Sequence, residues 1–187
     1  MRRLVLRTGG SRSATKTARV LLIAAAALAR ANASASAATT QLNGTFTVLF
    51  PKGHPASSAP CPPDAFCGVG SLVGYGQATI TIDTEDFQPI PGSPCFAVMR
   101  TEEIAPTSQV GILALDEHGT FCRPGGSGDS HASPRSYGSP GRFHLTYTID
   151  GAASTGTFAG ASGTGTTIMI VAGGVGVWTI RGSLNTT

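Results

Sequence analysis

Apolar and polar residues alternate over several long stretches of this chain, and that pattern limits its fold more than any other feature. In the segment RFHLTYTID, the apolar residues Phe143, Leu145, Tyr147 and Ile149 occupy every second position. Successive side chains of a β-strand point to opposite faces, so this spacing gives the segment one apolar face. Beyond residue 37, no window keeps apolar residues at helical spacing over three turns. The pattern predicts an all-β protein.

The same alternation predicts further strands along the chain. It recurs in LNGTFTVLF (42–50) and in GVGSLVGYGQATITI (68–82), which we expect to be one strand. Short Gly-containing turns, such as Asp150-Gly151 and Gly173-Gly174, separate several of the candidates. Seven or eight strands in about 150 residues predict one domain, a small closed barrel or a sandwich. The remaining candidate strands are 95–104, 109–122, 142–150, 162–171 and 175–184.

The first 37 residues are typical of a signal peptide. Basic residues without any acid precede VLLIAAAALA (20–29), an apolar core of about ten residues that is too short to span a bilayer. Ala35-Ser36-Ala37 offers small residues for cleavage, with Ala33-Ser34-Ala35 as the alternative site. The pair Arg2-Arg3 leaves a twin-arginine signal open. We therefore expect an extracellular protein whose mature domain comprises residues 38–187.

Charge is divided unevenly between these two parts. Seven of the 13 Lys and Arg residues precede Ala38, whereas all 10 Asp and Glu residues follow it. The mature part therefore carries six basic and ten acidic side chains, a net charge of −4. Nucleic-acid binding needs clustered Lys and Arg, which six scattered basic residues do not supply. We expect neither a nucleic-acid partner nor a membrane span in the mature chain.

The cysteine content predicts two disulfides. The chain has four cysteines, all in the expected mature part, and an even number in an exported protein favours disulfides over free thiols. Three pairings are possible. We expect Cys61 to pair with Cys67, which closes a short loop in CPPDAFC, and Cys95 to pair with Cys122. A zinc site formed by Cys61, Cys67 and His54 is the alternative, but its spacing matches no common ligand pattern.

The pairing of Cys95 with Cys122 follows from a predicted hairpin. A turn at Ala105-Pro106-Thr107-Ser108 brings the two cysteines together across neighbouring strands, with an offset of about two residues. We assign that offset to a solvated bulge at Asp116-Glu117-His118-Gly119. The acids in DTED (83–86) are expected to be a solvated strand end, since they lack the pattern of a calcium loop.

The segment GTFAGASGTG (156–165) could be a phosphate-binding loop or a glycine-rich strand. A phosphate loop needs a lysine followed by Ser or Thr at the start of a helix, and a dinucleotide fingerprint needs a helix. The residues that follow are Thr166, Thr167, Ile168 and Met169, which favour a strand. We therefore expect a strand whose glycines permit bends beside Phe158, and no nucleotide or other cofactor.

GTFAGASGTGT, preceded by YTID and followed by a hydrophobic strand, resembles the glycine-rich strand pair of the allene oxide cyclase and dirigent-type barrels. Together with CGVGSLVGYGQAT, it makes the chain most similar to uncharacterised secreted bacterial members of that superfamily. The resemblance covers most of 42–184 and implies an antiparallel barrel of about eight strands with an apolar interior. The better-known relatives cyclise a fatty-acid epoxide or orient phenoxy radicals. Their catalytic residues do not align with positions here, so no activity is carried over.

Three functions fit such a barrel. It could bind a small lipophilic ligand in its interior, with Tyr75 and Tyr147 as the polar contacts. It could have cyclase or dirigent-type activity, for which Arg100 and Glu102 are the candidate inward residues because they share one face of a strand. It could instead be a structural or protein-interaction module with a solid core. A cavity of a few hundred cubic ångströms favours the first two functions, and a packed interior favours the third.

Overall fold

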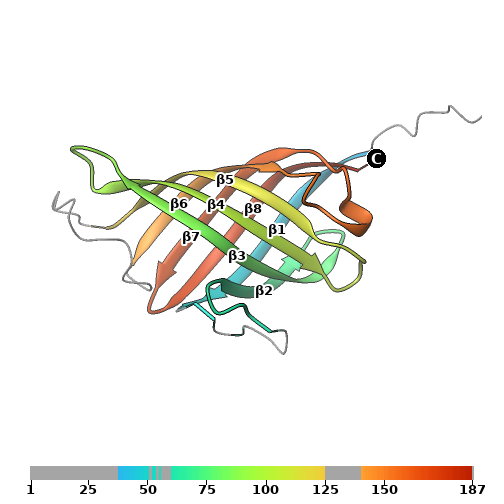
Figure 1. Ribbon diagram of the computed structural model, residues 1–187, viewed down its shortest axis with the longest axis horizontal. Helices are drawn as coiled ribbons and strands as arrows, with labels where there is room; N and C mark the ends of the chain where they lie inside the picture. Colours follow the sequence, from blue (N-terminus) through green and yellow to red (C-terminus); the bar gives the residue numbers. More distant parts are fainter. Residues whose placement is uncertain (1–37, 51, 54, 56–59, 125–139, 187) are drawn as a thin grey trace, which may run out of the picture. The chain divides into compact units, whose positions relative to one another are not determined.

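The computed structural model describes residues 38–50, 52–53, 55, 60–124 and 140–186. Eight antiparallel strands follow one another around a closed barrel, and the last strand pairs with the first (Figure 1). The predicted all-β barrel is confirmed, and a sandwich is ruled out by this closing pair. The predicted signal peptide lies outside the described residues. The strands are β1 (Ala38–Leu49), β2 (Phe66–Leu72), β3 (Gly76–Pro89), β4 (Cys95–Pro106), β5 (Leu113–Cys122), β6 (Gly141–Ile149), β7 (Thr164–Ala172) and β8 (Val175–Thr186).

The connections gather at two ends of the barrel. The end that we call the disulfide end carries both disulfides and the turns at 90–94 and 173–174. The opposite end, called the Phe158 end, carries the turns at 73–75 and 107–112 and the segment 150–163, and it lies on the right in Figure 1. Each strand therefore runs from one of these ends to the other.

Side chains from alternate positions fill the interior. In β6, Phe143, Leu145, Tyr147 and Ile149 are buried, whereas His144 between them is exposed. The residues that form the apolar core keep no more than 7 % of their surface exposed. The rings of Phe121 and Phe143 lie 4.6 Å apart near the disulfide end. The alternation found in the sequence thus corresponds to an inner and an outer wall.

Both predicted disulfides are present. Cys61 is bonded to Cys67, and Cys95 is bonded to Cys122. The first bond rules out the zinc alternative, which needs both cysteines as thiolates. The bulge predicted at 116–119 is wrong, because β4 and β5 pair without a register shift from Cys95–Cys122 to Ile104–Leu113. The last paired residues, Ile104 and Leu113, enclose the segment 105–112, which is longer than the expected turn and is centred midway between the two cysteines.

Two glycine-containing segments differ from the prediction. The expected strand 68–82 is a hairpin of β2 and β3, because a turn at 73–75 divides it and Gly74 has a φ of +84°. The segment 156–165 is mainly a loop, since a short 3-10 helix, η1 (Gly156–Phe158), precedes a turn in which Gly160 has a φ of +73°. Phe158 is fully buried, and its ring lies 5.6 Å from that of Tyr75. The loop therefore closes this end of the barrel.

A bulge does occur, but in β3. Ile82 pairs with Glu102 and Glu85 pairs with Arg100, so β3 contains one more residue than β4 over this interval. The extra residue lets both Ile82 and Glu85 point inward. The expectation of a solvated strand end is therefore wrong for Glu85, whereas Asp83 and Asp86 on either side of it are exposed.

Candidate functional site

A row of polar side chains crosses the interior of the barrel. Neighbouring strands pair Glu85 with Arg100, Arg100 with Glu117, and Glu117 with Tyr147. The pairing continues from Tyr147 to Gly165 of β7 and then to Gly182 of β8. Glu102 lies two residues beyond Arg100 on the same inner face of β4. We call these four charged residues and Tyr147 the polar row.

The guanidinium of Arg100 contacts all three carboxylates of the polar row. Its Nε donates a hydrogen bond to Glu117 Oε2 at 2.7 Å, and its Nη1 lies 3.5 Å from Glu85 Oε1. Its Nη2 lies 2.5 Å from Glu102 Oε1, but this contact lacks the orientation of a hydrogen bond. The guanidinium also stands 5.1 Å from the centre of the Phe143 ring. Arg100 therefore links three strands through charge.

Several polar atoms of the interior have no hydrogen-bond partner among the described residues. They include both carboxyl oxygens of Glu102, Oε1 of Glu117 and the hydroxyl of Tyr147. The residues that carry them are only 1–3 % exposed, so these atoms lie away from bulk solvent. An unpaired buried polar group costs about 1–3 kcal/mol. The polar row is therefore not explained by the stability of the fold, because apolar side chains of similar volume are often as stabilising as buried ion pairs.

Burial sets the protonation of the row. It raises the pKa of Glu102 well above the usual range, because the attraction of Arg100 does not offset the loss of water and Glu117 adds repulsion. Burial likewise raises the pKa of the Glu85 carboxyl, against the opposing effect of Arg100. For Arg100, burial alone would lower the pKa, but the three carboxylates outweigh it and keep the guanidinium charged. The row thus combines an acid of raised pKa with a permanent cation.

Two glycines make room for the tyrosine of the row. A Cβ atom at Gly165 would lie 2.5 Å from Cε1 of Tyr147, and one at Gly182 would clash with the Tyr147 hydroxyl oxygen. The aromatic ring therefore extends over β7 towards β8. Burial, with a smaller effect of Glu117, raises the pKa of Tyr147 to about 12. The tyrosine is neutral at physiological pH and can donate or accept a hydrogen bond.

The structure brings together three of the four predicted site residues. Arg100, Glu102 and Tyr147 point into the interior, and Glu103 beside Glu102 is exposed, as its alternate position requires. Tyr75 does not belong to this group. It is half-buried in the turn at the Phe158 end, where its carbonyl accepts a hydrogen bond from Ser108.

The sequence interpretation missed Glu85 and Glu117. Glu117 was assigned to a solvated bulge, although it shares the parity of Leu113, Leu115 and Phe121, which is a signal for an inward position. Glu85 has no such regular signal, because the bulge in β3 changes which positions face inward. The shift in parity between the inward residues Ile82 and Phe87 is the only trace of that bulge in the sequence.

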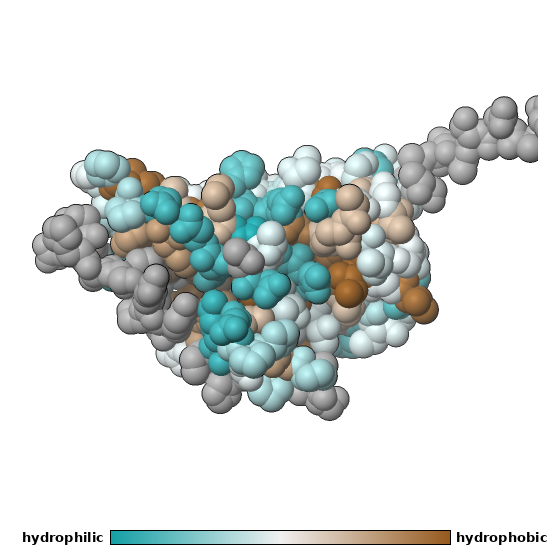
Figure 2. All heavy atoms as spheres, in the orientation of Figure 1, coloured by the Kyte–Doolittle hydropathy of each residue, from teal (hydrophilic) through white to brown (hydrophobic). Residues whose placement is uncertain are grey.

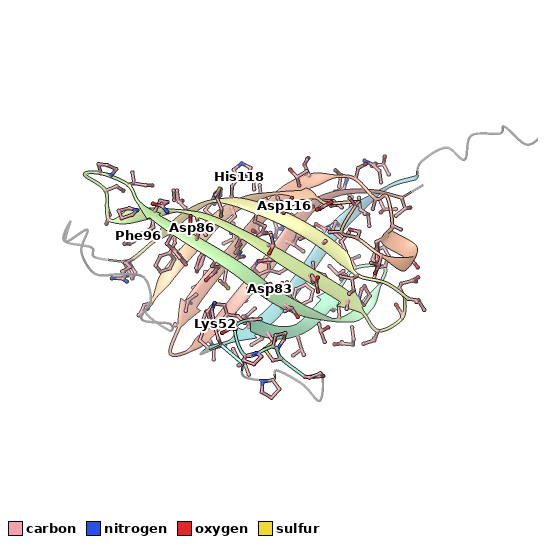
Figure 3. The ribbon with its side chains drawn as sticks, viewed as in Figure 1. Lys52, Asp83, Asp86, Phe96, Asp116 and His118 are labelled. Carbon is pink, nitrogen blue, oxygen red and sulfur yellow. A yellow bond between two sulfur atoms is a disulfide. The ribbon has the colours of Figure 1, made fainter. Side chains whose placement is uncertain are left out.

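The outer wall carries polar residues and shallow hollows. Asp86, Asp116 and His118 stand on the wall formed by β3, β4 and β5, as Figure 3 shows. Together with Met99, Arg100, Thr101 and Glu117, they line a hollow of about 400 Å³. Figure 2 shows hydrophilic residues over much of this wall. Within the described part of the chain, no group of His, Cys, Asp or Glu has a metal-binding arrangement.

Comparison with known proteins adds no relative to this description. No family model matches the chain, and neither a curated protein nor a solved structure matches it. The described residues also include no helix that is long and apolar enough to cross a membrane. The class that fold and site define is therefore an eight-stranded, disulfide-bonded barrel with a charged interior.

Proposed function

We propose that this protein is an interaction module with a solid core, which acts through its outer wall and loops. The observation that supports this proposal most is the filling of the interior. The side chains of Arg100 and Glu102 have no exposed surface, and the apolar core residues around them keep no more than 7 % of theirs. An eight-stranded barrel is narrow enough for its own side chains to fill it. The hollows that described residues line, such as the one beside Asp86, open on the outer wall.

The β7–β8 hairpin supplies a surface for such contacts. Ile170 and Val177 face each other on its outer wall and are 56 % and 48 % exposed. Ile170 also borders a hollow of about 470 Å³ that Pro124, Pro140 and Arg142 line. Exposed apolar side chains next to an arginine are typical of protein-contact surfaces. We infer that a protein partner binds here.

Export of the protein is part of this proposal. Two disulfides are compatible with an oxidising compartment outside the cytosol. If residues 1–37 are a signal peptide, the exported protein begins with Ala38-Thr39-Thr40. N-terminal sequencing of the exported protein tests this expectation, and a retained Met1 would contradict it.

A second candidate is binding of a small lipophilic ligand in the interior. The observation that favours it is the set of unpaired polar atoms on Glu102, Glu117 and Tyr147, which a ligand could satisfy. Such a ligand has to displace side chains that now fill the space. The cyclase or dirigent-type alternative needs Arg100 or Glu102 to reach a substrate. Both are instead bound to each other and closed off from solvent.

Native mass spectrometry of the exported protein separates the two candidates. The solid-core proposal predicts the mass of the polypeptide alone and no rise in Tm with a panel of lipophilic amines, alcohols and acids. A co-purified small molecule, or a Tm increase that Tyr147→Phe abolishes, would favour the ligand-binding barrel instead.

The contact surface has its own test. A partner captured by the wild-type protein should be lost with Ile170→Asp/Val177→Asp, which places charge on the apolar hairpin wall. The control Thr146→Ala/Thr166→Ala changes an exposed pair on β6 and β7 and should retain the partner. Equal capture by both variants would contradict the assignment of the surface.

A further inference from the structure

The interior of the barrel holds more negative than positive charge. Three carboxylates, those of Glu85, Glu102 and Glu117, surround the one guanidinium of Arg100, and their side chains are 0–6 % exposed. If all four groups were ionised, the polar row would carry a net charge of −2. A carboxylate that is buried without a partner takes up a proton rather than remain charged.

The elements packed against the row supply little compensating charge. From β6 the row faces Tyr147, and from β7 and β8 it faces the uncharged Gly165 and Gly182. Lys52, between β1 and β2, attracts Glu85 from the disulfide end. Glu102 and Glu117 share the same guanidinium, that of Arg100.

The contacts indicate where the proton resides. Glu117 Oε2 accepts a 2.7 Å hydrogen bond from Arg100 Nε, the geometry of a charge-assisted pair. Both oxygens of Glu102 lack a hydrogen-bond partner, and Glu117 Oε1 lacks one as well. The two carboxyl groups meet at one guanidinium, Glu102 Oε1 at 2.5 Å from Nη2 and Glu117 Oε2 at 2.7 Å from Nε, but two carboxylates cannot donate to each other. A proton on Glu102 resolves this, because its O–H can donate to Glu117.

We propose that the folded barrel holds a proton between Glu102 and Glu117 at neutral pH, so that folding takes up a proton and the barrel is a pH-dependent device. The unfolded chain ionises its glutamates with a pKa of about 4.3. Because burial raises the pKa of folded Glu102, the folded state binds more protons than the unfolded state above that pH. The stabilisation is fully present below the unfolded pKa and is lost as the pH rises through the folded pKa. Glu85 contributes with the same sign.

Urea unfolding at pH 5, 7 and 9 tests the proposal with two matched variants. Glu102→Gln replaces the protonated acid by a neutral side chain of the same shape, and Glu103→Gln makes the same change at the exposed neighbour. The midpoint of the wild type should fall from pH 5 to pH 9, and that of Glu103→Gln should fall in parallel. The midpoint of Glu102→Gln should fall much less and exceed the wild-type value at pH 9. A wild-type slope that Glu102→Gln leaves unchanged would overturn the proposal.

A second measurement needs no variant. Carbon-13 NMR of glutamate carboxyl groups in the wild-type protein at pH 7 should show one carboxyl with the chemical shift of the protonated form. Unfolding in weakly buffered solution at pH 7 should release about one proton, by the linkage relation. A spectrum in which every glutamate is ionised at pH 7 would overturn the proposal even if Glu102→Gln fails to fold.

Discussion

The ring of Tyr147 lies on the backbone of Gly165, with no space between them for a side chain. A methyl group at Gly165 would meet two ring carbons of Tyr147 at 2.5 and 2.6 Å. The ring is held between strands on a fully buried inner wall, so it cannot move aside freely. The glycine of the GTGT motif therefore serves the packing of a tyrosine and not the binding of a phosphate.

Gly165→Ala should destabilise the barrel by about 1–3 kcal/mol, the usual cost of overpacking a core. Urea unfolding measures this, and Thr166→Ala, an exposed change on the same strand, is the control. The double variant Gly165→Ala/Tyr147→Leu should lose less than the sum of the two single losses, because the two sites are in direct contact; the backbone oxygen of Arg181, which the methyl group also meets, keeps part of the loss. Additive losses in the double variant would contradict the packing explanation.

Tyr147→Phe should change the response to alkali. The pKa of Tyr147 is raised to about 12 in the folded protein, against about 10 in an unfolded chain. Its contribution to stability is present below pH 10 and is lost as the pH rises towards 12. Circular dichroism melts between pH 9 and 12 should show a smaller fall in Tm for the variant than for the wild type. At pH 7 the two proteins should differ by no more than about 1 kcal/mol, because the hydroxyl lacks a partner.

Phe158→Ala should remove the side chain that closes one end of the barrel. Its ring is fully buried and packs against Tyr75, so its loss leaves a cavity. A cost of about 3–5 kcal/mol is expected from comparable core truncations. Thermal unfolding measures it, with the exposed Ala159→Ser as the neighbouring control. Equal stability of the two variants would show that the loop does not close the barrel.

Removal of the Cys95–Cys122 disulfide should cost about 2–5 kcal/mol, the range for small secreted domains. The bond joins directly opposed residues of β4 and β5 and spans 27 residues of chain. The Cys61–Cys67 bond spans 6 residues, so its removal should cost less in the chain-entropy model. Denaturant unfolding of the two double alanine variants compares them, and a larger loss for Cys61–Cys67 would contradict this order.

Local pattern predicted much of the wall of the barrel. The alternation in β6 placed Tyr147 inside and His144 outside, and parity placed Arg100 and Glu102 on one face. The hairpin predicted around residues 105–108 gave the correct pairing of Cys95 with Cys122, although its turn is longer than expected. These features depend on the two-residue period of a strand, which is visible in any single segment.

Features that depend on several strands could not be predicted in this way. The extra residue in β3 turns Glu85 inward, and its position is set by pairing with β4. The loop at 156–163 precedes the strand-favouring residues of β7, which led to the prediction of a strand, but it lies across the Phe158 end, where positive φ angles at Gly156 and Gly160 bend it. The charge balance around Arg100 arises only when β3, β4 and β5 are side by side.

The closing ladder between β1 and β8 brings the two ends of the barrel domain together. It pairs Ala38 with Thr186 and continues to Leu49 with Val175. During synthesis the first strand can pair with β2, but its other edge has no partner until the last strand has been made, so the ring closes late and by its least local contact. The same adjacency makes the domain suitable for circular permutation. A short linker would join residue 186 to residue 38, and the new ends would lie in the turn at Gly173-Gly174. Because this turn lies outside the β7–β8 ladder, all the ladders of the barrel would be preserved.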